Sequence, residues 1–150
     1  MRLSIVIPVY QVEQYVADCL SSVLDSSSTD YEVIIVNDGS KDASMDIVNS
    51  MASAHNCIRV INQQNQGLSA ARMNGLEAAI GDFVWFIDSD DYVTPAATSE
   101  ILDTICSNSD IDVFEVVFLC TDNVQIKSVA RSSDCRHIDM PLAGQELTGY

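Results

Sequence analysis

The stretch YEVIIVND (residues 31–38) is apolar and largely β-branched until it ends in Asn and Asp. A strand with one exposed face alternates apolar and polar residues, whereas a strand buried on both faces is apolar nearly throughout. LSIVIPV (3–9) and DFVWFIDSD (82–90) have the same character. These three segments predict strands of a parallel sheet that is covered by helices on both faces.

Helical periodicity fills the gaps between the strands. Apolar residues recur at helical spacing over 12–24 and 43–51, and GLSAARMNGLEAAIG (67–81) is a third helix, rich in small residues and ending at Gly81. A fourth helix is expected to start near Pro95. CIRVINQ (57–63) and DIDVFEVVFLC (110–120) add two further strands, and the alternation predicts an α/β, Rossmann-like fold. One side of the third helix carries Leu68, Ala71, Arg72, Gly75, Leu76 and Ala79.

The composition excludes several classes of protein. The chain has 150 residues, with 22 acidic against 7 basic side chains, which argues against nucleic-acid binding. Its five cysteines include no CxxC pair, which indicates reduced thiols rather than a disulfide framework or a zinc site. No apolar stretch approaches the ~20 residues of a membrane span, and no signal peptide is recognisable. A cytoplasmic protein with a single domain over residues 1–150 is therefore expected.

Polar and acidic residues follow three of the predicted strands. The first strand leads into PVYQVE (8–13), the second into NDGSKD (37–42) and the fourth into DSDD (88–91). Because ligands of open α/β sheets bind outside the carboxyl ends of the strands, these segments are expected to converge on one rim.

Asp88 and Asp90 are candidate metal ligands. If the chain stays extended there, residues two apart face the same side. Two carboxylates can then share Mg²⁺ or Mn²⁺, and that ion can bridge a diphosphate which the acidic protein would otherwise repel. The alternative is an acidic turn followed by a helix, with Asp91 near its N-terminus.

Other candidates are weaker when taken alone. Asp38 can accept hydrogen bonds from a nucleobase or a ribose, and Gly39 permits a sharp turn, although Asp-Gly turns are common. Tyr10 offers a surface on which a base can stack, and Glu13 offers an acceptor. Arg72 is expected to pair with one of the carboxylates, to contact a nucleotide, or simply to face solvent.

The combined pattern resembles the nucleotide-sugar-binding half of an inverting glycosyltransferase of family 2, with the GT-A fold. The resemblance runs from SIVIPVYQVEQYVADCLSSVL through EVIIVNDGSKDAS to NQGLSAARMNGLEAAIGDFVWFIDSDDYVTP, roughly the first hundred residues. Two departures concern details of donor contacts: the family usually has Asn where this chain has Gln11, and Asn where it has Met73.

The resemblance implies a UDP-sugar or related donor, a hydroxyl acceptor on a polysaccharide, a lipid-linked oligosaccharide or another molecule, and metal ligation by Asp88 and Asp90. It implies that the catalytic base lies beyond Tyr150, so the domain is expected to be truncated on its acceptor-binding side. Peripheral membrane association through downstream segments is compatible with it. The nucleotide contacts that it implies are Pro8, Tyr10, Glu13, Asp38, Gly39, Arg72, Asp88 and Ser89.

Three alternatives remain open at this point. A phosphatase of the haloacid dehalogenase type also places a DxD after an apolar strand, but DSDDYV lacks the usual Gly-Thr. A dinucleotide-binding domain is disfavoured because no GxGxxG follows the first strand. A non-catalytic module that binds a nucleotide would share the same cleft.

Overall fold

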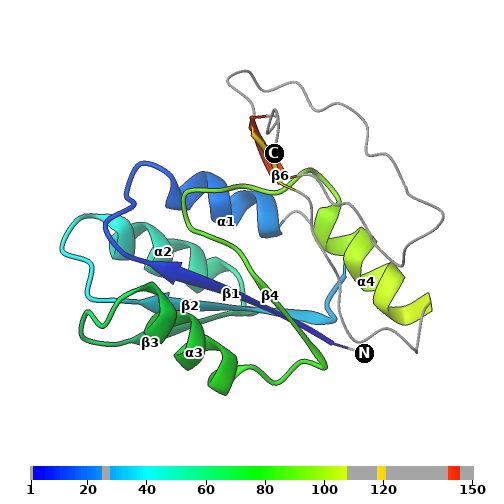
Figure 1. Ribbon diagram of the computed structural model, residues 1–150, viewed down its shortest axis with the longest axis horizontal. Helices are drawn as coiled ribbons and strands as arrows, with labels where there is room; N and C mark the ends of the chain where they lie inside the picture. Colours follow the sequence, from blue (N-terminus) through cyan, green and yellow to red (C-terminus); the bar gives the residue numbers. More distant parts are fainter. Residues whose placement is uncertain (1, 25–27, 108–117, 121–141, 146–150) are drawn as a thin grey trace, which may run out of the picture.

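The computed structural model describes residues 2–24, 28–107, 118–120 and 142–145. Four parallel strands form one sheet in the order β3-β2-β1-β4 (Figure 1). They are β1 (Leu3–Val9), β2 (Tyr31–Asn37), β3 (Ile58–Asn62) and β4 (Phe83–Phe86). The predicted α/β architecture with a parallel sheet is confirmed.

The two central strands are the most deeply buried elements. Every residue of β1 is buried, and so is every residue of β2 except Asn37. The edge strands β3 and β4 are only partly buried, and Phe86 is 36% exposed. The predicted continuous burial of 82–90 is therefore wrong for β4, which ends at Phe86 and, among the described residues, pairs with β1 alone.

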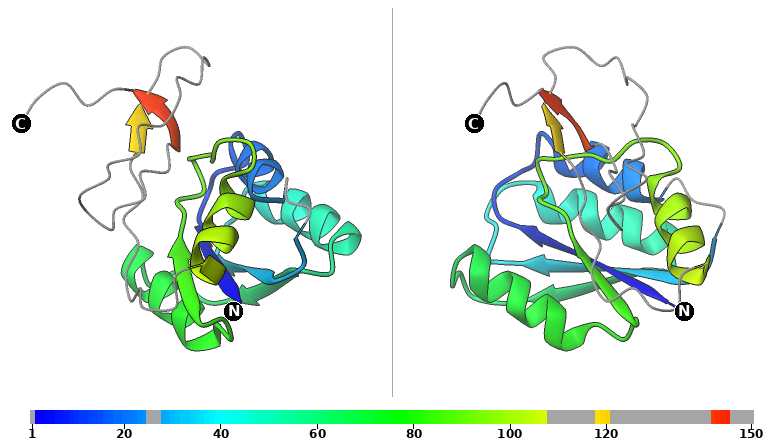
Figure 2. Two further views of the ribbon diagram at one scale, coloured as in Figure 1. Left: turned by 90° about the vertical axis from the view of Figure 1, so that its right-hand side faces the viewer. Right: turned by 45° about the vertical axis from the view of Figure 1, so that its right-hand side comes forward.

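Helices cover both faces of the sheet, as predicted. Helices α1 (Val16–Leu24), α2 (Ser44–Ala54) and α4 (Ala97–Ser107) share one core with the β1 and β2 side chains on their side. Helix α3 (Leu68–Ala78) packs on the opposite face, against Val6, Ile34 and Val36. Figures 1 and 2 show α1 and α2 on one side of the sheet and α3 on the other.

Of the residues predicted to share one side of α3, only the small ones are buried against the sheet. Ala71 and Gly75 are buried, whereas Leu68 and Leu76 are 49% and 41% exposed. Only small residues fit, since a Cβ added at Gly75 would lie 2.2 Å from Cγ1 of Val6. The large apolar residues therefore point away from the sheet.

Gly81 also has a role other than the predicted helix stop. The helix ends at Ala78, with Ala79 as its C-cap. A Cβ at Gly81 would lie 2.7 Å from the carbonyl oxygen of Arg2 and 2.8 Å from the backbone nitrogen of Ser4. Glycine thus allows the chain to pass close to β1 as it enters β4.

The segment before α1 is held by the loop that leads into α2. The backbone N–H groups of Gln11, Val12 and Glu13 donate to side-chain oxygens of Ser40, Ser44 and Asp42. These bonds hold the segment in a turn, so the helix begins at Val16, although the helical pattern starts at residue 12. Gln11 adopts a left-handed φ of 54° in this turn.

Most of the predicted fifth strand, 110–120, lies outside the described residues. Its last three residues form β5 (Phe118–Cys120), which pairs in parallel with β6 (Leu142–Gln145) in a separate two-stranded sheet. In the part of the chain that the structure describes, none of the helices has the length and apolar character required to cross a bilayer.

Gly75 should be intolerant of even one added carbon. Gly75→Ala is expected to lower the free energy of unfolding by about 1–3 kcal/mol, the usual cost of overpacking a core. The matched control is Glu77→Ala on the exposed side of the same helix, which should change it by less than about 0.5 kcal/mol. Urea unfolding followed by circular dichroism measures both, and equal effects would contradict the close approach of α3.

The left-handed turn at Gln11 should be a site of stored strain. Gln11→Gly is expected to raise the free energy of unfolding by about 1 kcal/mol, because glycine has no Cβ to clash at positive φ. Gln64→Gly, in an exposed loop without a positive φ, should instead lower it by roughly 0.5–1 kcal/mol. Effects of the same sign in the two variants would argue against strain at Gln11.

Candidate functional site

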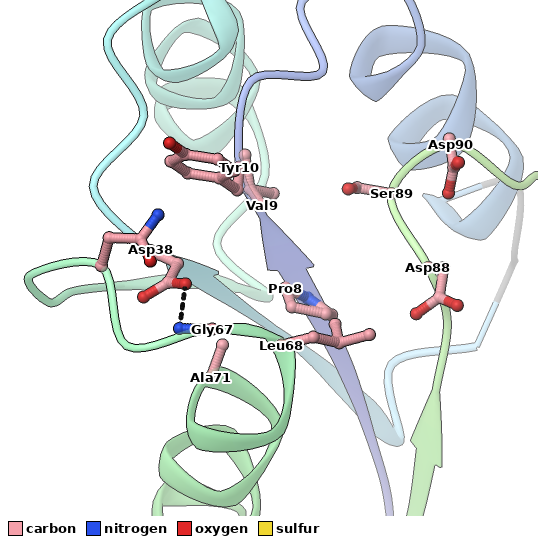
Figure 3. Close-up of a pocket in the computed structure, with 11 residues that line it drawn as sticks. Pro8, Val9, Tyr10, Asp38, Gly67, Leu68, Ala71, Asp88, Ser89 and Asp90 are labelled. Carbon is pink, nitrogen blue, oxygen red and sulfur yellow. Dashed lines mark hydrogen bonds between the residues drawn. The ribbon is translucent and has the colours of Figure 1, made fainter.

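A cleft of about 430 Å³ lies at the carboxyl ends of the strands. Residues that follow β1, β2, β3 and β4 all contribute to it, as the topology of a parallel sheet requires. Figure 3 shows Asp38 and Gly67 on one side of the end of β1, with Asp88, Ser89 and Asp90 on the other. The lining consists of Pro8, Val9, Tyr10, Asp38, Asn65, Gly67, Leu68, Ala71, Asp88, Ser89 and Asp90.

Asp38 is a buried carboxylate with partners on both oxygens. Its side chain follows β2, and the residue is only 3% exposed. Oδ1 accepts hydrogen bonds from Nε2 of Gln63 and the backbone nitrogen of Gln66, both at 2.8 Å. Oδ2 accepts one from the backbone nitrogen of Gly67 at 2.9 Å. The carboxylate therefore ties the end of β2 to the loop that leads into α3.

Tyr10 forms an aromatic wall of the cleft. It follows the last residue of β1, lines the cleft and is 46% exposed. Its neighbour Gln11 is held by Ser40, whose hydroxyl lies 3.2 Å from the Gln11 backbone nitrogen. An exposed ring beside a buried carboxylate is a suitable surface on which a planar base can stack.

The acidic segment after β4 is a turn rather than an extended strand. The backbone nitrogen of Asp91 donates to the carbonyl oxygen of Asp88 at 3.0 Å, which closes a four-residue turn. The premise that the chain stays extended there is wrong. Asp88 and Asp90 nevertheless both line the cleft, because the turn brings the two side chains to the same side.

Arg72 pairs with Asp88, one of the partners that the sequence suggested. A guanidinium nitrogen of Arg72 donates to Oδ1 of Asp88, and the two side chains are 37% and 39% exposed. The Nε of Arg72 is buried and has no hydrogen-bond partner among the described residues. Oδ2 of Asp88 is not engaged by this ion pair, which leaves an oxygen available for a further cationic partner.

The acidic turn concentrates negative charge. Burial, followed by the charges of Asp90 and Asp88, raises the pKa of the Asp91 carboxyl above its ordinary value. Burial and the same three carboxylates raise the pKa of the Cys19 thiol to about 12. One arginine does not balance this charge, so the turn is an electrostatically favourable place for a cation.

The donor set fits a hard divalent cation only in part. Carboxylate oxygens of the kind that Asp88 and Asp90 supply are the ligands that Mg²⁺ and Mn²⁺ prefer. No group of three or more His, Cys, Asp or Glu side chains suited to a metal occurs among the described residues. An ion held by these two carboxylates would therefore need further oxygen ligands from water or from a bound phosphate.

The nine residues predicted to contact a nucleotide or a metal do not all line the cleft. Six of them line it, namely Pro8, Tyr10, Asp38, Asp88, Ser89 and Asp90. Glu13, Gly39 and Arg72 are not among the lining residues. Their predicted nucleotide contacts, like those of the other six residues, stay predictions.

The structure shows a local role for each of the three residues that do not line the cleft. Oε2 of Glu13 accepts a hydrogen bond from the backbone nitrogen of Ala43 at 2.8 Å, at the start of α2. Gly39 has a positive φ of 78°, and a Cβ there would lie 3.1 Å from the backbone nitrogen of Asn65. Arg72 acts next to the cleft through Asp88.

Sequence reasoning missed the loop that follows β3. Gln63, Gln66 and Gly67 donate hydrogen bonds to Asp38, and Asn65 lines the cleft. Asn74 of α3 donates to Oε1 of Gln63 at 2.6 Å. The signal was present, since this loop follows a strand of the same parallel sheet and the rule about carboxyl ends applies to it equally. The residues of this loop were not predicted as site residues because they are uncharged, unlike the acidic segments after the other strands.

Comparison with known proteins agrees with this architecture. The profile of the family described as Glycosyl transferase family 2 matches residues 4–145. The uncharacterized glycosyltransferase EpsJ of Bacillus subtilis (strain 168) is 45% identical over 94 residues, covering 63% of this chain and 27% of EpsJ. The poly(ribitol-phosphate) beta-glucosyltransferase of Bacillus spizizenii is 38% identical over 97 residues, covering 62% of this chain and 15% of the relative.

Solved structures show the same arrangement of strands and helices. The crystal structure of S. aureus TarS in complex with UDP-GlcNAc has a TM-score of 0.74 and 27% identity, covering 85% of this chain and 37% of that chain. The chain thus spans less than a third of the length of the two curated relatives named above. On the strength of the family match over 4–145, the chain belongs to glycosyltransferase family 2, with the GT-A fold.

Proposed function

We propose that the cleft binds the nucleotide-sugar donor, a UDP-sugar, of an inverting glycosyltransferase that depends on a divalent cation. The observation that carries the proposal is the convergence of Asp38, Asp88 and Asp90 on one cleft. UDP-GlcNAc and UDP are the molecules bound in two TarS structures that share the fold of this chain, which supports a uridine nucleotide.

The nucleoside would occupy the side of the cleft formed by Tyr10 and Asp38. The Tyr10 ring is exposed enough to stack on a base, while Asp38 is buried and can only accept hydrogen bonds. Base–aromatic stacking is worth about 1–3 kcal/mol. The hydrogen bond to Asp38 would add selectivity for a base with an N–H in its ring, as uracil has at position 3.

The diphosphate would lie towards Asp88, Ser89 and Asp90. Because carboxylates repel phosphate, this placement requires a cation between them, and Asp88 and Asp90 are the residues that would hold it. A bound divalent cation would stabilise the negative charge that develops on the departing nucleoside diphosphate. Arg72 would orient Asp88 through their ion pair and would add positive charge near the leaving group.

The reaction itself would be a single displacement at the anomeric carbon. The acceptor oxygen forms a bond to that carbon as the bond to the phosphate oxygen breaks on the opposite face, and a base takes the hydroxyl proton. The carboxylates that line the described part of the cleft are Asp38, Asp88 and Asp90, and each already has a proposed task. We therefore assign the base to a residue outside the described ranges.

Family membership decides between most of the alternatives. The phosphatase and dinucleotide-binding interpretations both require another family, whereas the match to glycosyltransferase family 2 spans 4–145. A module that binds the donor without turning it over would use the same cleft. Sugar transfer by the chain itself, measured with a UDP-sugar and a hydroxyl acceptor, separates that alternative from an active enzyme.

Binding of UDP should stabilise the chain only when Mn²⁺ is present. At a UDP concentration about 100 times the dissociation constant, the gain is ~2.7 kcal/mol, and a tenfold weaker site at the same concentration gains only ~1.4 kcal/mol. We expect this smaller gain for Asp90→Asn, while Asp103→Asn on the exposed surface of α4 should match the wild type. Thermal unfolding with and without EDTA measures the stabilisation by UDP in each protein. Full stabilisation in EDTA would rule out the metal bridge.

Tyr10 should contribute through its ring rather than its hydroxyl. Tyr10→Ala is expected to weaken UDP binding by about 1–3 kcal/mol, whereas Tyr10→Phe should stay within about 0.5 kcal/mol of the wild type, because stacking needs only the π-face. Tyr15→Ala is the matched control, since Tyr15 is 52% exposed but does not line the cleft. Isothermal titration calorimetry with UDP and Mn²⁺ distinguishes these outcomes.

A further inference from the structure

We propose that Gln63 and Asn74 are positioning residues that orient the carboxylate of Asp38, and so select a donor whose base presents an N–H at ring position 3. This inference rests on the proposed function of the cleft. It assigns a role to two uncharged side chains that lie outside the acidic motifs and do not line the cleft.

The two amides form a directed chain of hydrogen bonds. Nδ2 of Asn74, on α3, donates to Oε1 of Gln63 at 2.6 Å. Nε2 of Gln63, just after β3, then donates to Oδ1 of Asp38 at 2.8 Å. Because Oε1 of Gln63 is occupied by Asn74, the amide of Gln63 can present only its N–H to Asp38. The direction of the first bond therefore fixes the direction of the second.

The hydrogen bonds to Asp38 show which acceptor position of its carboxylate is left for a ligand. From the residues that the structure describes, Oδ1 accepts two hydrogen bonds, from Gln63 and the backbone of Gln66, while Oδ2 accepts one, from the backbone of Gly67. A carboxylate oxygen has room for two acceptor contacts, so Oδ2 can take one more. Asp38 lines the cleft, which places this vacant acceptor position where a ligand can reach it.

A carboxylate held in this way distinguishes a base with an N–H at ring position 3 from one with a lone pair there. Uracil carries an N–H at ring position 3, which can donate to Oδ2. Cytosine has a lone pair on the same nitrogen, which would face a negatively charged oxygen in a site that is 3% exposed. Leaving a buried charged acceptor opposite a lone pair is costly, so uracil should be preferred.

Asn74→Asp reverses the chain with almost no change in shape. The new carboxylate has no N–H to offer, so Gln63 would turn its amide to donate to residue 74 and would present Oε1 to Asp38. Two oxygens would then face each other, and the orientation of Asp38 would be lost. Asn74→Leu removes the donor without adding charge. Leu76→Asp adds the same charge at an exposed position of the same helix and is the matched control.

The experiment measures dissociation constants for UDP and for CDP by calorimetry, with Mn²⁺ in the buffer, for the wild type and these three variants. We expect the preference for UDP over CDP to fall by about tenfold or more in Asn74→Asp, and by a smaller factor in Asn74→Leu, as suits a hydrogen bond to a charged group. Leu76→Asp should keep the wild-type preference. Circular dichroism confirms that each variant is folded.

The outcomes separate this inference from the proposed function. A wild type that binds neither nucleotide overturns the proposed function and this inference with it. A wild type that binds UDP and CDP equally, or a preference that survives both substitutions at Asn74, overturns the inference alone. If the substitutions only lower the thermal stability and leave the preference unchanged, Gln63 and Asn74 are structural, and the inference fails.

Discussion

The cleft depends on one buried carboxylate. Asp38 donates its backbone N–H to the carbonyl oxygen of Val9 at 2.9 Å, and its side chain accepts three hydrogen bonds from the segment between β3 and α3. It therefore joins the ends of β1 and β2 to the loop after β3. A buried charge is tolerated only when it is hydrogen-bonded, so the loop and the carboxylate require each other. Tyr10 and Gly67 are held next to this junction.

The opposite side of the cleft is governed by electrostatics. Asp88, Asp90 and Asp91 lie within one turn, and Arg72 neutralises only part of their charge. The chain as a whole has a formal net charge of −15, so its field repels anions at long range. For the proposed donor, this field is the reason to expect a cation at the turn. The two sides of the cleft thus differ: the carboxylate of Asp38 is hydrogen-bonded by uncharged protein donors, whereas the acidic turn carries an excess of negative charge.

The amino-acid pattern was sufficient for the sheet and for the place of the cleft. Continuous apolar runs identified β1 and β2, and the carboxyl-end rule brought Asp38, Asp88 and Asp90 together. The pattern did not predict features that depend on how closely two elements pack. The inward face of α3 is set by how closely Gly75 approaches Val6, and no periodicity of apolar residues encodes that distance. Gln63 and Asn74 were missed because amides act through the direction of their hydrogen bonds, which only coordinates reveal.

The small-residue face of α3 limits how this scaffold can be remodelled. With Ala71 and Gly75 pressed against the sheet, the helix has no spare volume into which it could slide or rotate. The backbone of α3 is consequently held close to the sheet at these two positions. Changes of sequence and length would be tolerated in the loops, where an insertion leaves the core intact. The position of the helix would stay the same. For the proposed donor site, substitutions in 63–67 are therefore better tolerated by the fold than substitutions on the inward face of α3.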